Sequence, residues 1–361
     1  MEKRITTASR AREKSRAEAV SIRMLSHQLA SPQFKAPEEV VSHFGAVQAQ
    51  DYRMMRWAVS MRTVRPSMEV FRKAYDDGKI VRLHLLRGTW QLVSAEDYWW
   101  MLRLCGPRSE AVIRGWMRSN KIEIPEEELL KVREILAGEA RRGGSVTKED
   151  FVRALAVHGI TMDDHRLSYH IRMSELSGTL CSGDLQPLKA TYSLSESKLG
   201  AEPSPADRDE SLALLARKYF RSHSPATLED FVWWSGLSIG DCRTAVAVLG
   251  DELHTETLSG REFLVHCSCR TRGFRKGRVI LLPPYDEYLI GYKSRDIVLD
   301  EEVSHRAHNK TGIFYPVILH DGRVCGNWKP AGMSLDFFEE CPADESAVSK
   351  AKALFSDFMA R

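Results

Sequence analysis

Two carboxamide side chains stand two residues apart within residues 45–51, whose sequence is GAVQAQD. In an extended segment, residues two apart point the same way, so Gln48 and Gln50 would share one target while Ala49 points into the protein. Carboxamide oxygens can accept hydrogen bonds from a water molecule and present partial negative charge to a cationic reaction centre, and neither group has to titrate. Alternatively, both glutamines satisfy backbone groups near a helix start that Asp51 caps. Taken alone, these residues favour that structural role.

A second candidate is the sequence RGTW at residues 87–90. Its glycine would let the loop approach a phosphate closely, the Arg87 guanidinium could pair with that phosphate, and Trp90 could pack against a sugar or base. The simpler interpretation is a hairpin with a buried tryptophan. Apolar and polar residues alternate on both sides of this sequence, which predicts two half-buried strands at 81–85 and 89–93.

The composition is that of a globular protein. With 361 residues, 43% of them hydrophobic and 28% charged, the chain is long enough for about two to four domains with buried cores. No run approaches the ~18 consecutive apolar residues of a membrane-spanning helix, and no signal-peptide core follows the basic N-terminus. The seven cysteines are scattered and lack the paired spacing of a zinc site. We therefore expect a cytoplasmic protein with reduced thiols that is not bound to a membrane.

Basic residues cluster in two stretches, although the net charge of the chain is only +3. One stretch spans residues 3–23, and the other spans residues 270–278 and contains Arg272, Arg275 and Lys276. Either stretch could neutralise phosphates along a duplex. For a charge run taken by itself, a solvated tail or loop is the favoured interpretation. The surrounding architecture has to decide between the two.

An internal repeat indicates duplicated modules. Residues 147–152 (TKEDFV) reappear as residues 227–232 (TLEDFV). In each copy the threonine can accept a hydrogen bond from a backbone N–H of the first helical turn, and the acidic residues that follow suit the helix dipole. Each copy therefore starts a short helix. Further helices are expected around the two copies, at 125–142, 163–177, 207–222 and 238–249.

Short β-prone runs follow the third helix of each copy, so each module is expected to consist of three helices and a hairpin, which is the winged-helix plan. The N-terminal third fits a longer variant, with helices at 17–29, 36–44 and 51–62. Strands are also expected at 190–194, 256–258, 263–265, 279–282, 314–319 and 324–328, and helices at 95–119 and 347–359. The predicted organisation is an α+β chain with a basic arm at 1–16, winged-helix domains at 17–120, 121–200 and 201–275, and a β-rich domain at 276–361.

The winged-helix plan suggests a partner. Such a module places its third helix in the major groove of DNA or its wing in the minor groove. Three modules in tandem would line a long concave surface, and Arg166, His170 and Arg172 stand at helical spacing on the predicted helix 163–177. This arrangement favours a DNA duplex. The alternatives are a solvated polar helix face and a module that binds proteins, because a fold alone does not establish DNA binding.

Five segments together resemble the winged-helix DNA glycosylases of the AlkZ/YcaQ type. They are GAVQAQD at 45–51, GKIVRLHLLRGTWQLV at 78–93, TLEDFVWWSGL at 227–237, YDEYLIGYKSR at 285–295 and GIFYPVILHDGRVCGNW at 312–328. The resemblance runs along nearly the whole chain. It implies that the three winged helices form a C-shaped channel that holds double-stranded DNA.

The resemblance also implies an activity. The family has a three-residue catalytic signature that consists of a glutamine, an apolar residue and then a glutamine or aspartate. This signature falls on Gln48, Ala49 and Gln50. We therefore expect a DNA-repair glycosylase that hydrolyses the N-glycosidic bond of purines alkylated at N7 or N3, with interstrand crosslinks as a further substrate. An N7-alkylated purine is cationic and leaves readily, so the glutamines need mainly to orient water and stabilise an oxocarbenium-like sugar. No lysine stands out as the nucleophile of a lyase, which favours a monofunctional enzyme.

Contacts to DNA follow from the same resemblance. Residues 305–310 occupy the position of the DNA-probing hairpin of the family, which places Arg306 and His308 at the minor groove, with a solvated turn as the alternative. Gln91 stands where related sequences often carry histidine, and its amide can still donate a hydrogen bond. The full set of expected DNA contacts is His84, Arg87, Trp90, Gln91, Arg166, His170, Arg272, Arg275, Lys276, Arg295, Arg306 and His308.

Asp286 and Glu287 are acidic beside a supposed DNA surface, so we expect them to pair with Arg295 or Lys293 rather than to contact phosphates. The chain has no glycine-rich loop of the Walker or dinucleotide type, so neither a nucleotide cofactor nor a metal is expected. A monomer is expected. The competing hypotheses are a non-catalytic DNA-binding protein, in which Gln48 and Gln50 are structural, and a protein-interaction scaffold without affinity for duplex DNA.

Overall fold

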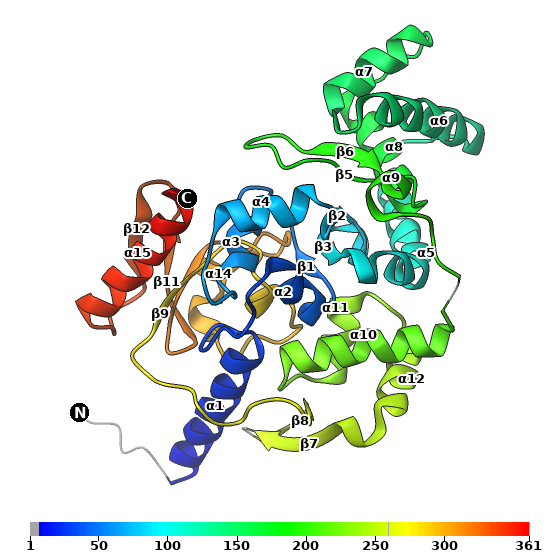
Figure 1. Ribbon diagram of the computed structural model, residues 1–361. Coiled ribbons are helices and arrows are strands. Elements are labelled where there is room, and N and C mark those ends of the chain that lie inside the picture. Colours follow the sequence, from blue (N-terminus) through cyan, green and yellow to red (C-terminus); the bar gives the residue numbers. More distant parts are fainter. Residues whose placement is uncertain (1–6, 205, 259, 361) are drawn as a thin grey trace.

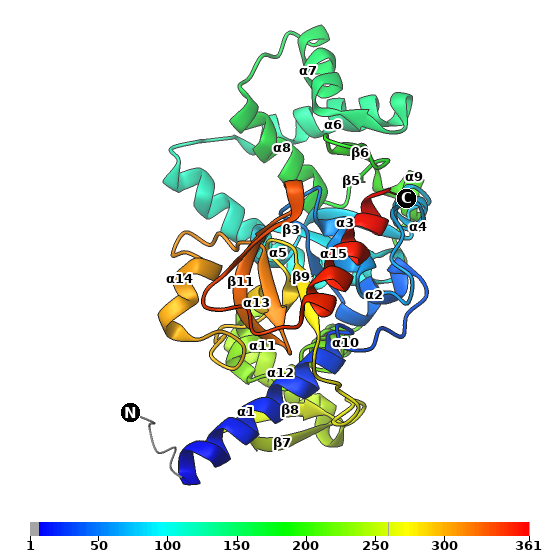
Figure 2. The same ribbon diagram turned by 90° about the vertical axis from the view of Figure 1, so that its left-hand side faces the viewer.

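The computed structural model describes residues 7–204, 206–258 and 260–360. These residues form a mixed α+β fold with four separate sheets (Figure 1). In chain order, we call the elements around these sheets the first, second, third and C-terminal groups. The second group projects away from the other three, at the top of Figures 1 and 2.

The first group contains the glutamine motif. Its antiparallel sheet has the order β1-β3-β2, formed by β1 (Val47–Gln48), β2 (Ile80–His84) and β3 (Trp90–Ser94). Its helices are α1 (Thr7–Ser26), α2 (Pro37–Phe44), α3 (Met55–Ser60), α4 (Met68–Asp76) and α5 (Ala95–Ser119), and a 3-10 turn covers Leu86–Gly88. The strands expected at 81–85 and 89–93 and the helix expected at 95–119 are confirmed, whereas α4 was not predicted.

The N-terminal helix begins earlier than predicted. A helix was expected only from residue 17, but α1 starts at Thr7, while residues 1–6 lie outside the described part of the chain. The reason is a set of contacts to the C-terminal group. Arg16 donates to the carbonyl of Ile297 at 2.8 Å and pairs with Asp300 at 2.8 Å. Part of the basic stretch is therefore held by protein groups rather than solvated.

The second and third groups repeat one order of elements. The second contains α6 (Glu126–Gly143), β4 (Val146–Thr147), α7 (Lys148–Val157), α8 (Asp164–Leu176), β5 (Leu180–Ser182), β6 (Thr191–Leu194) and α9 (Ser195–Leu199). The third contains α10 (Arg208–His223), α11 (Leu228–Ser235), α12 (Ile239–Leu249), β7 (Leu253–Leu258) and β8 (Arg261–His266), with a 3-10 turn at Gly250–Glu252. The predicted helices and hairpin strands of both groups are confirmed to within a few residues.

The predicted threonine caps are also confirmed. Thr147 Oγ1 accepts a hydrogen bond from the N–H of Asp150 at 3.3 Å, and the Asp150 carboxylate accepts the N–H of Thr147 at 2.7 Å. Thr227 and Asp230 make the same pair of bonds at 3.1 and 2.9 Å. These reciprocal bonds satisfy backbone donors that a helix start leaves unpaired, so the repeated TxxD sequence fixes the start of α7 and of α11.

The C-terminal group contains a four-stranded antiparallel sheet of order β12-β11-β10-β9. Its elements are β9 (Val279–Leu282), α13 (Glu287–Ile290), α14 (Ser304–Ala307), β10 (Val317–His320), β11 (Arg323–Lys329), β12 (Ser334–Phe337) and α15 (Glu345–Ala360), with 3-10 turns at Glu301–Val303 and Ala331–Met333. Trp57 of α3 joins this sheet to the first group, because its indole donates to the carbonyl of Leu281 at 2.8 Å and its ring packs on Phe355 of α15. The strands expected at 279–282, 314–319 and 324–328 and the helix expected at 347–359 are confirmed to within a few residues.

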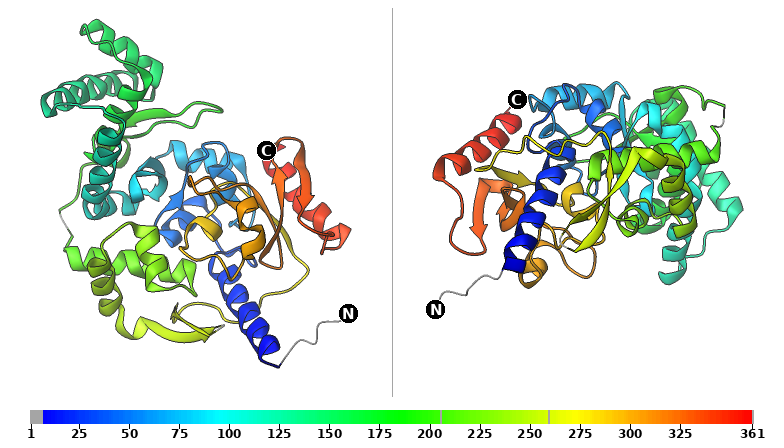
Figure 3. Two further views of the ribbon diagram at one scale, coloured as in Figure 1. Left: turned by 180° about the vertical axis from the view of Figure 1, so that it is seen from behind. Right: turned by 90° about the horizontal axis from the view of Figure 1, so that it is seen from below.

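Helix α1 lies between the third and C-terminal groups, as seen from below in Figure 3. Buried residues of α1 share one hydrophobic core with the C-terminal sheet and with the β7-β8 hairpin. The seven cysteines are free thiols. Within the described ranges, no helix is long and apolar enough to cross a membrane.

Candidate active site

Both glutamines of the motif line one cavity of about 420 Å³. The walls of this cavity come from all four groups of elements. The lining residues are Gln48, Gln50, His84, Arg87, Gly88, Thr89, Trp90, Trp116, Arg172, Trp233, Tyr285, Ile290, Thr311, Gly312, Ile313 and Phe314. We call this space the glutamine cavity.

Gln48 is 4% exposed and its carboxamide oxygen is surrounded by donors. Oε1 accepts hydrogen bonds from Gln91 Nε2 at 2.8 Å, from Arg87 at 3.2 Å and from the Thr89 hydroxyl at 3.3 Å. The pairing of β1 with β3 places Gln48 opposite Gln91 and makes these contacts possible. Gln48 is therefore held by side chains and not by the backbone groups of a helix start.

Gln50 differs sharply from Gln48. Its side chain is exposed, and it has no hydrogen-bond partner among the described residues. Between the two glutamines, Ala49 is fully buried, as predicted. The Asp51 carboxylate accepts the backbone N–H groups of Arg53 and Met54, both at 2.9 Å, and so caps the turn before α3, which begins at Met55 and not at residue 51 as predicted. That cap uses Asp51 alone and leaves Gln50 available for a ligand.

The Arg87 guanidinium donates hydrogen bonds to groups of the protein itself. Besides Gln48, its guanidinium donates to the backbone carbonyls of Trp233 and Trp234 at the end of α11. Burial lowers the pKa of Arg87 below its usual value, but the group remains a cation. Arg87 adopts a φ of 56° within the 3-10 turn, which directs it toward α11. It thus ties the third group to the glutamine motif, and its predicted phosphate contact stays a prediction.

The predicted partners of the two acidic residues are wrong. Asp286 pairs with Arg62 through two bonds of 2.7 and 2.9 Å, and both side chains are nearly inaccessible to solvent. Glu287 accepts the backbone N–H of Gln48 at 2.6 Å and the indole N–H of Trp234 at 3.1 Å. Neither expected partner pairs with them: Arg295 donates to the carbonyl of Leu289, and Lys293 contributes only its backbone N–H, which donates to Asp230.

His84 lies on the wall of the cavity beside Trp90, with ring centroids 3.6 Å apart. Its Nδ1 lies 2.6 Å from Glu175 of α8, so this contact joins the first and second groups. Burial lowers the pKa of His84 well below its usual value and raises the pKa of Glu175 to about 8. Burial thus favours a neutral pair near neutral pH.

The Glu175 carboxyl predicts a pH dependence of stability. Its folded-state pKa of about 8 lies above the unfolded value of about 4.3, so the folded protein binds the proton more tightly. The contribution of Glu175 to stability should therefore fall as pH rises between these two values, and Glu175→Gln should remove that contribution from the pH profile. Thermal unfolding of both proteins across this pH range measures the effect. Parallel pH profiles for the two proteins would contradict it.

Two further predicted DNA contacts face protein instead. Arg166 pairs with Glu128 of α6 through bonds of 2.9 and 2.6 Å, and His170 lies 3.0 Å from the same carboxylate. His170 is only 1% exposed. Arg172, two residues further along α8, lines the glutamine cavity instead. Of the basic residues on this helix, Arg172 is the one that the structure brings to the candidate site.

The segment that follows the predicted probing hairpin lines the same cavity, whereas none of residues 305–310 does. His308 pairs with Phe314 as an isolated antiparallel bridge. Phe314 and the three residues before it, 311–313, line the glutamine cavity. Arg306 points elsewhere, since it pairs with Asp336 at 2.9 Å. Burial lowers the pKa of His308 below its usual value.

Arg295 lies close to the glutamine cavity. Its guanidinium packs 4.8 Å from the ring of Phe314 and 5.7 Å from Trp233, both of which line the cavity. Burial lowers the pKa of Arg295 to about 10. By contrast, Arg272, Arg275 and Lys276 are exposed in the segment between β8 and β9 and do not line the cavity.

Several site residues were missed by sequence reasoning. Trp116 and Trp233 are 37% and 41% exposed and face the glutamine cavity, and Tyr285 adds a third aromatic wall. An exposed tryptophan is unusual, but a sequence does not reveal exposure. Tyr285 directly precedes the acidic pair of the YDEYLIGYKSR segment, which was the available signal.

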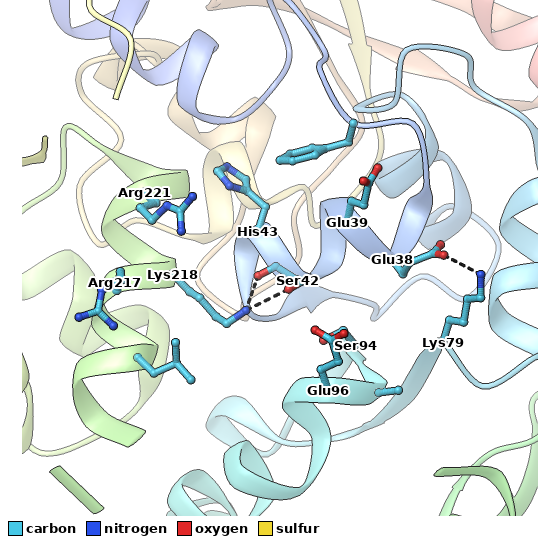
Figure 4. Close-up of a pocket in the computed structure, with 13 residues that line it drawn as sticks. Glu38, Glu39, Ser42, His43, Lys79, Ser94, Glu96, Arg217, Lys218 and Arg221 are labelled. Atoms are coloured by element: carbon cyan, nitrogen blue, oxygen red, sulfur yellow. Dashed lines mark hydrogen bonds and ion pairs between the residues drawn. The ribbon is translucent and has the colours of Figure 1, made fainter. Parts of the chain in front are cut away.

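A larger cavity of about 590 Å³ lies between α2, α10 and the start of α5 (Figure 4). In its wall Lys79 pairs with Glu38 at 2.9 Å, and Lys218 donates to the carbonyl of Ser42 at 2.7 Å and pairs with Asp97 at 2.9 Å. No residue that the sequence singled out lines it. Nor do the described residues contain a group of three or more His, Cys, Asp or Glu side chains arranged to hold a metal ion. The glutamine cavity is therefore the candidate active site.

Comparisons with known proteins identify the family of the chain. The AlkZ-like DNA glycosylase family matches residues 41–336, and the chain belongs to this family. One relative, the interstrand DNA cross-link repair glycosylase of Streptomyces sahachiroi, is 26% identical over 307 residues, which are 81% of this chain and 81% of the relative. The solved structure of the Streptomyces sahachiroi DNA glycosylase AlkZ matches with a TM-score of 0.76 at 23% identity, over 95% of this chain and 96% of that one. This likeness confirms the mixed α+β fold along nearly the whole chain.

Proposed function

We propose that this protein is a monofunctional DNA-repair glycosylase that hydrolyses the N-glycosidic bond of purines alkylated at N7 or N3, with N7-linked interstrand crosslinks as a further substrate. The observation that carries the proposal is that Gln48 and Gln50 line one cavity. Both are polar groups that do not titrate, and such groups suit a reaction whose leaving group is already cationic. Membership of the AlkZ-like family supports the same reaction.

The first three groups of elements act, in this proposal, as tandem winged-helix domains that form a C-shaped channel for duplex DNA. The repeated order of helices, capped by Thr147 and Thr227, supports that arrangement. Arg172, Arg295 and the segment 308–314 lie at the cavity or beside it and would contact the DNA next to the flipped or distorted base. The basic residues of the loop 270–278 would meet phosphates further along the duplex.

The proposal is tested with duplex oligonucleotides that carry N7-alkylguanine, N3-alkyladenine or an N7-linked interstrand crosslink. Abasic-site formation is scored for the wild type and for the variant Gln48→Ala plus Gln50→Ala. We expect base release by the wild type and a loss of about 10²–10³-fold in the variant, with DNA binding retained. Gln33→Ala is the matched control, because Gln33 is an exposed glutamine outside the cavity.

The competing functions predict other results. A non-catalytic DNA-binding protein would release no base from any lesion, although its binding would weaken steeply as salt concentration rises. A protein-interaction scaffold would have no affinity for the duplex at all. Either outcome overturns the proposed activity.

A further inference from the structure

The two glutamines stand two residues apart, but their carboxamides are in opposite situations. The Oε1 atom of Gln48 accepts hydrogen bonds from Gln91, Arg87 and Thr89. The Thr89 hydroxyl has one hydrogen and also lies 3.0 Å from the carbonyl oxygen of Leu86. However, Gln91 and Arg87 alone fill the two lone pairs of the Gln48 amide oxygen, so no place remains for a water molecule on that atom. Gln50 is exposed in the same cavity and has no hydrogen-bond partner among the described residues. Only Gln50 has a carboxamide oxygen that is free to accept a hydrogen bond from water.

Arg87 fixes which end of the Gln48 amide faces the cavity. A guanidinium group has only donors, so a flipped amide would set the Nε2 hydrogens of Gln48 against those of Arg87. Arg87 cannot turn away without losing the carbonyls of Trp233 and Trp234. The Nε2 of Gln48 has no hydrogen-bond partner among the described residues, so it is the polar atom of this side chain that remains for a ligand. Gln48 therefore offers the cavity a donor.

We infer that the two glutamines divide the proposed reaction: Gln50 accepts a hydrogen bond from the attacking water, and Gln48 donates a hydrogen bond from its Nε2 to the departing base. This inference rests on the proposed glycosylase activity. The water oxygen forms a bond to C1′ of the deoxyribose, and the C1′–N bond breaks with its electron pair going to the base. The positive charge of the alkylated base is thereby cancelled, and the proton of the attacking water passes to solvent water.

The charges of the reaction assign the donor to the base. The sugar becomes cationic as the bond breaks, so an N–H group directed at it would be unfavourable, whereas an acceptor such as Gln50 Oε1 is favourable. The departing base gains an electron pair, and its remaining nitrogen and oxygen acceptors become stronger. A donor directed at those acceptors is worth more in the transition state than in the ground state, and such a difference accelerates the reaction. In this arrangement Arg87, Thr89 and Gln91 are positioning residues for Gln48.

The same substitution at both positions tests the division of roles. Gln48→Glu keeps an oxygen for Arg87, Thr89 and Gln91 to bind and replaces the Nε2 donor with a second, negatively charged oxygen, while Gln50→Glu keeps the acceptor for water. On a duplex with N7-methylguanine, we expect the single-turnover rate of Gln48→Glu to fall about 10²–10³-fold and that of Gln50→Glu to stay within about tenfold of the wild type. The rate of Gln50→Glu should also rise with pH through about 4.3, because the ionised carboxylate can take the proton of the water.

Two further measurements keep the test decisive if a variant is poorly folded. Wild-type protein is assayed on N7-methylated analogues whose base lacks either the N3 or the O6 acceptor. One analogue should slow the wild type strongly and slow Gln48→Glu little further, because the lost partner is the same. Gln50→Leu, which has no acceptor, should lose the activity that Gln50→Glu retains.

The outcomes are distinguishable. An active Gln48→Glu protein, or a Gln50→Glu protein that is inactive while folded, overturns the division of roles and leaves the glycosylase proposal intact. The division of roles is also overturned if both base analogues slow the wild type equally and each slows Gln48→Glu by the same factor as the wild type. Absence of base release by the wild type overturns the proposed activity together with the inference.

Discussion

Asp286→Ala is expected to destabilise the protein by about 3–5 kcal/mol, because it leaves the Arg62 guanidinium buried without its partner. The Arg62 and Asp286 side chains are 2% and 1% exposed, and they share two hydrogen bonds. Asp286 also accepts the backbone N–H of Tyr288 at 2.9 Å at the start of α13. The loss would therefore reach the segment that carries Glu287. Denaturant unfolding followed by circular dichroism measures the change in the free energy of unfolding.

The exposed pair of Lys73 and Asp77 on α4 provides the control. Exposed ion pairs contribute little because solvent screens them, so Asp77→Ala should leave the unfolding midpoint nearly unchanged. The double variant Arg62→Met plus Asp286→Ala should lose less stability than the two single variants added together, since it contains no unpaired buried charge. An Asp286→Ala protein as stable as the Asp77→Ala protein would show that the pair does not hold this region.

Glu287→Ala should lower both stability and base release. The Glu287 carboxylate accepts the backbone N–H of Gln48 and the indole N–H of Trp234, and the side chain is 2% exposed. Each donor left unpaired in the interior costs about 1–3 kcal/mol. The freed strand β1 would no longer hold Gln48 at a fixed place, and a displacement of about 1 Å can cost about 10²-fold in rate. Single-turnover assays at a temperature where the variant is folded separate the two effects.

Glu287→Gln is the conservative comparison. Its amide oxygen can still accept the N–H of Gln48, but its amide nitrogen would then face the indole N–H of Trp234, donor against donor, and His223 Nε2, which lies 3.3 Å from the same carboxylate oxygen. We expect a smaller loss of rate than for Glu287→Ala and a clear loss of stability. A Glu287→Ala protein that is less stable but releases base at the wild-type rate would mean that this carboxylate supports the fold and not the position of Gln48.

Much of the fold could be predicted because its signals are local. Thr147 and Thr227 predict the starts of their helices, because each can form a capping pair with the aspartate three residues later. The strands around the RGTW sequence follow from the alternation of apolar and polar residues along a short run. The burial of Ala49 between two cavity residues also followed from the period of an extended segment. Each of these features depends on residues that are neighbours in the chain.

The contacts that build the site could not be predicted in the same way. Arg62 and Asp286 are 224 residues apart, and Glu287 reaches Gln48 across 239 residues. A charged residue can pair with any opposite charge, and only the packed structure decides which one it meets. Arg166 and His170 show the same limit, because the sequence placed them on a helix face and the structure turns that face toward Glu128. Helix α4 has no repeat or motif that singled it out.

The glutamine cavity has walls from residue 48 to residue 314. A ribosome makes the chain from its N-terminus, so Gln48 and Gln50 emerge from the ribosome long before Tyr285 and the segment 311–314 have been made. While those residues are missing, the cavity lacks one side and Gln48 lacks the carboxylate of Glu287 that holds its backbone. The site can therefore close only after residue 314 has been made, and shorter fragments left by interrupted synthesis would carry the motif without a complete cavity around it.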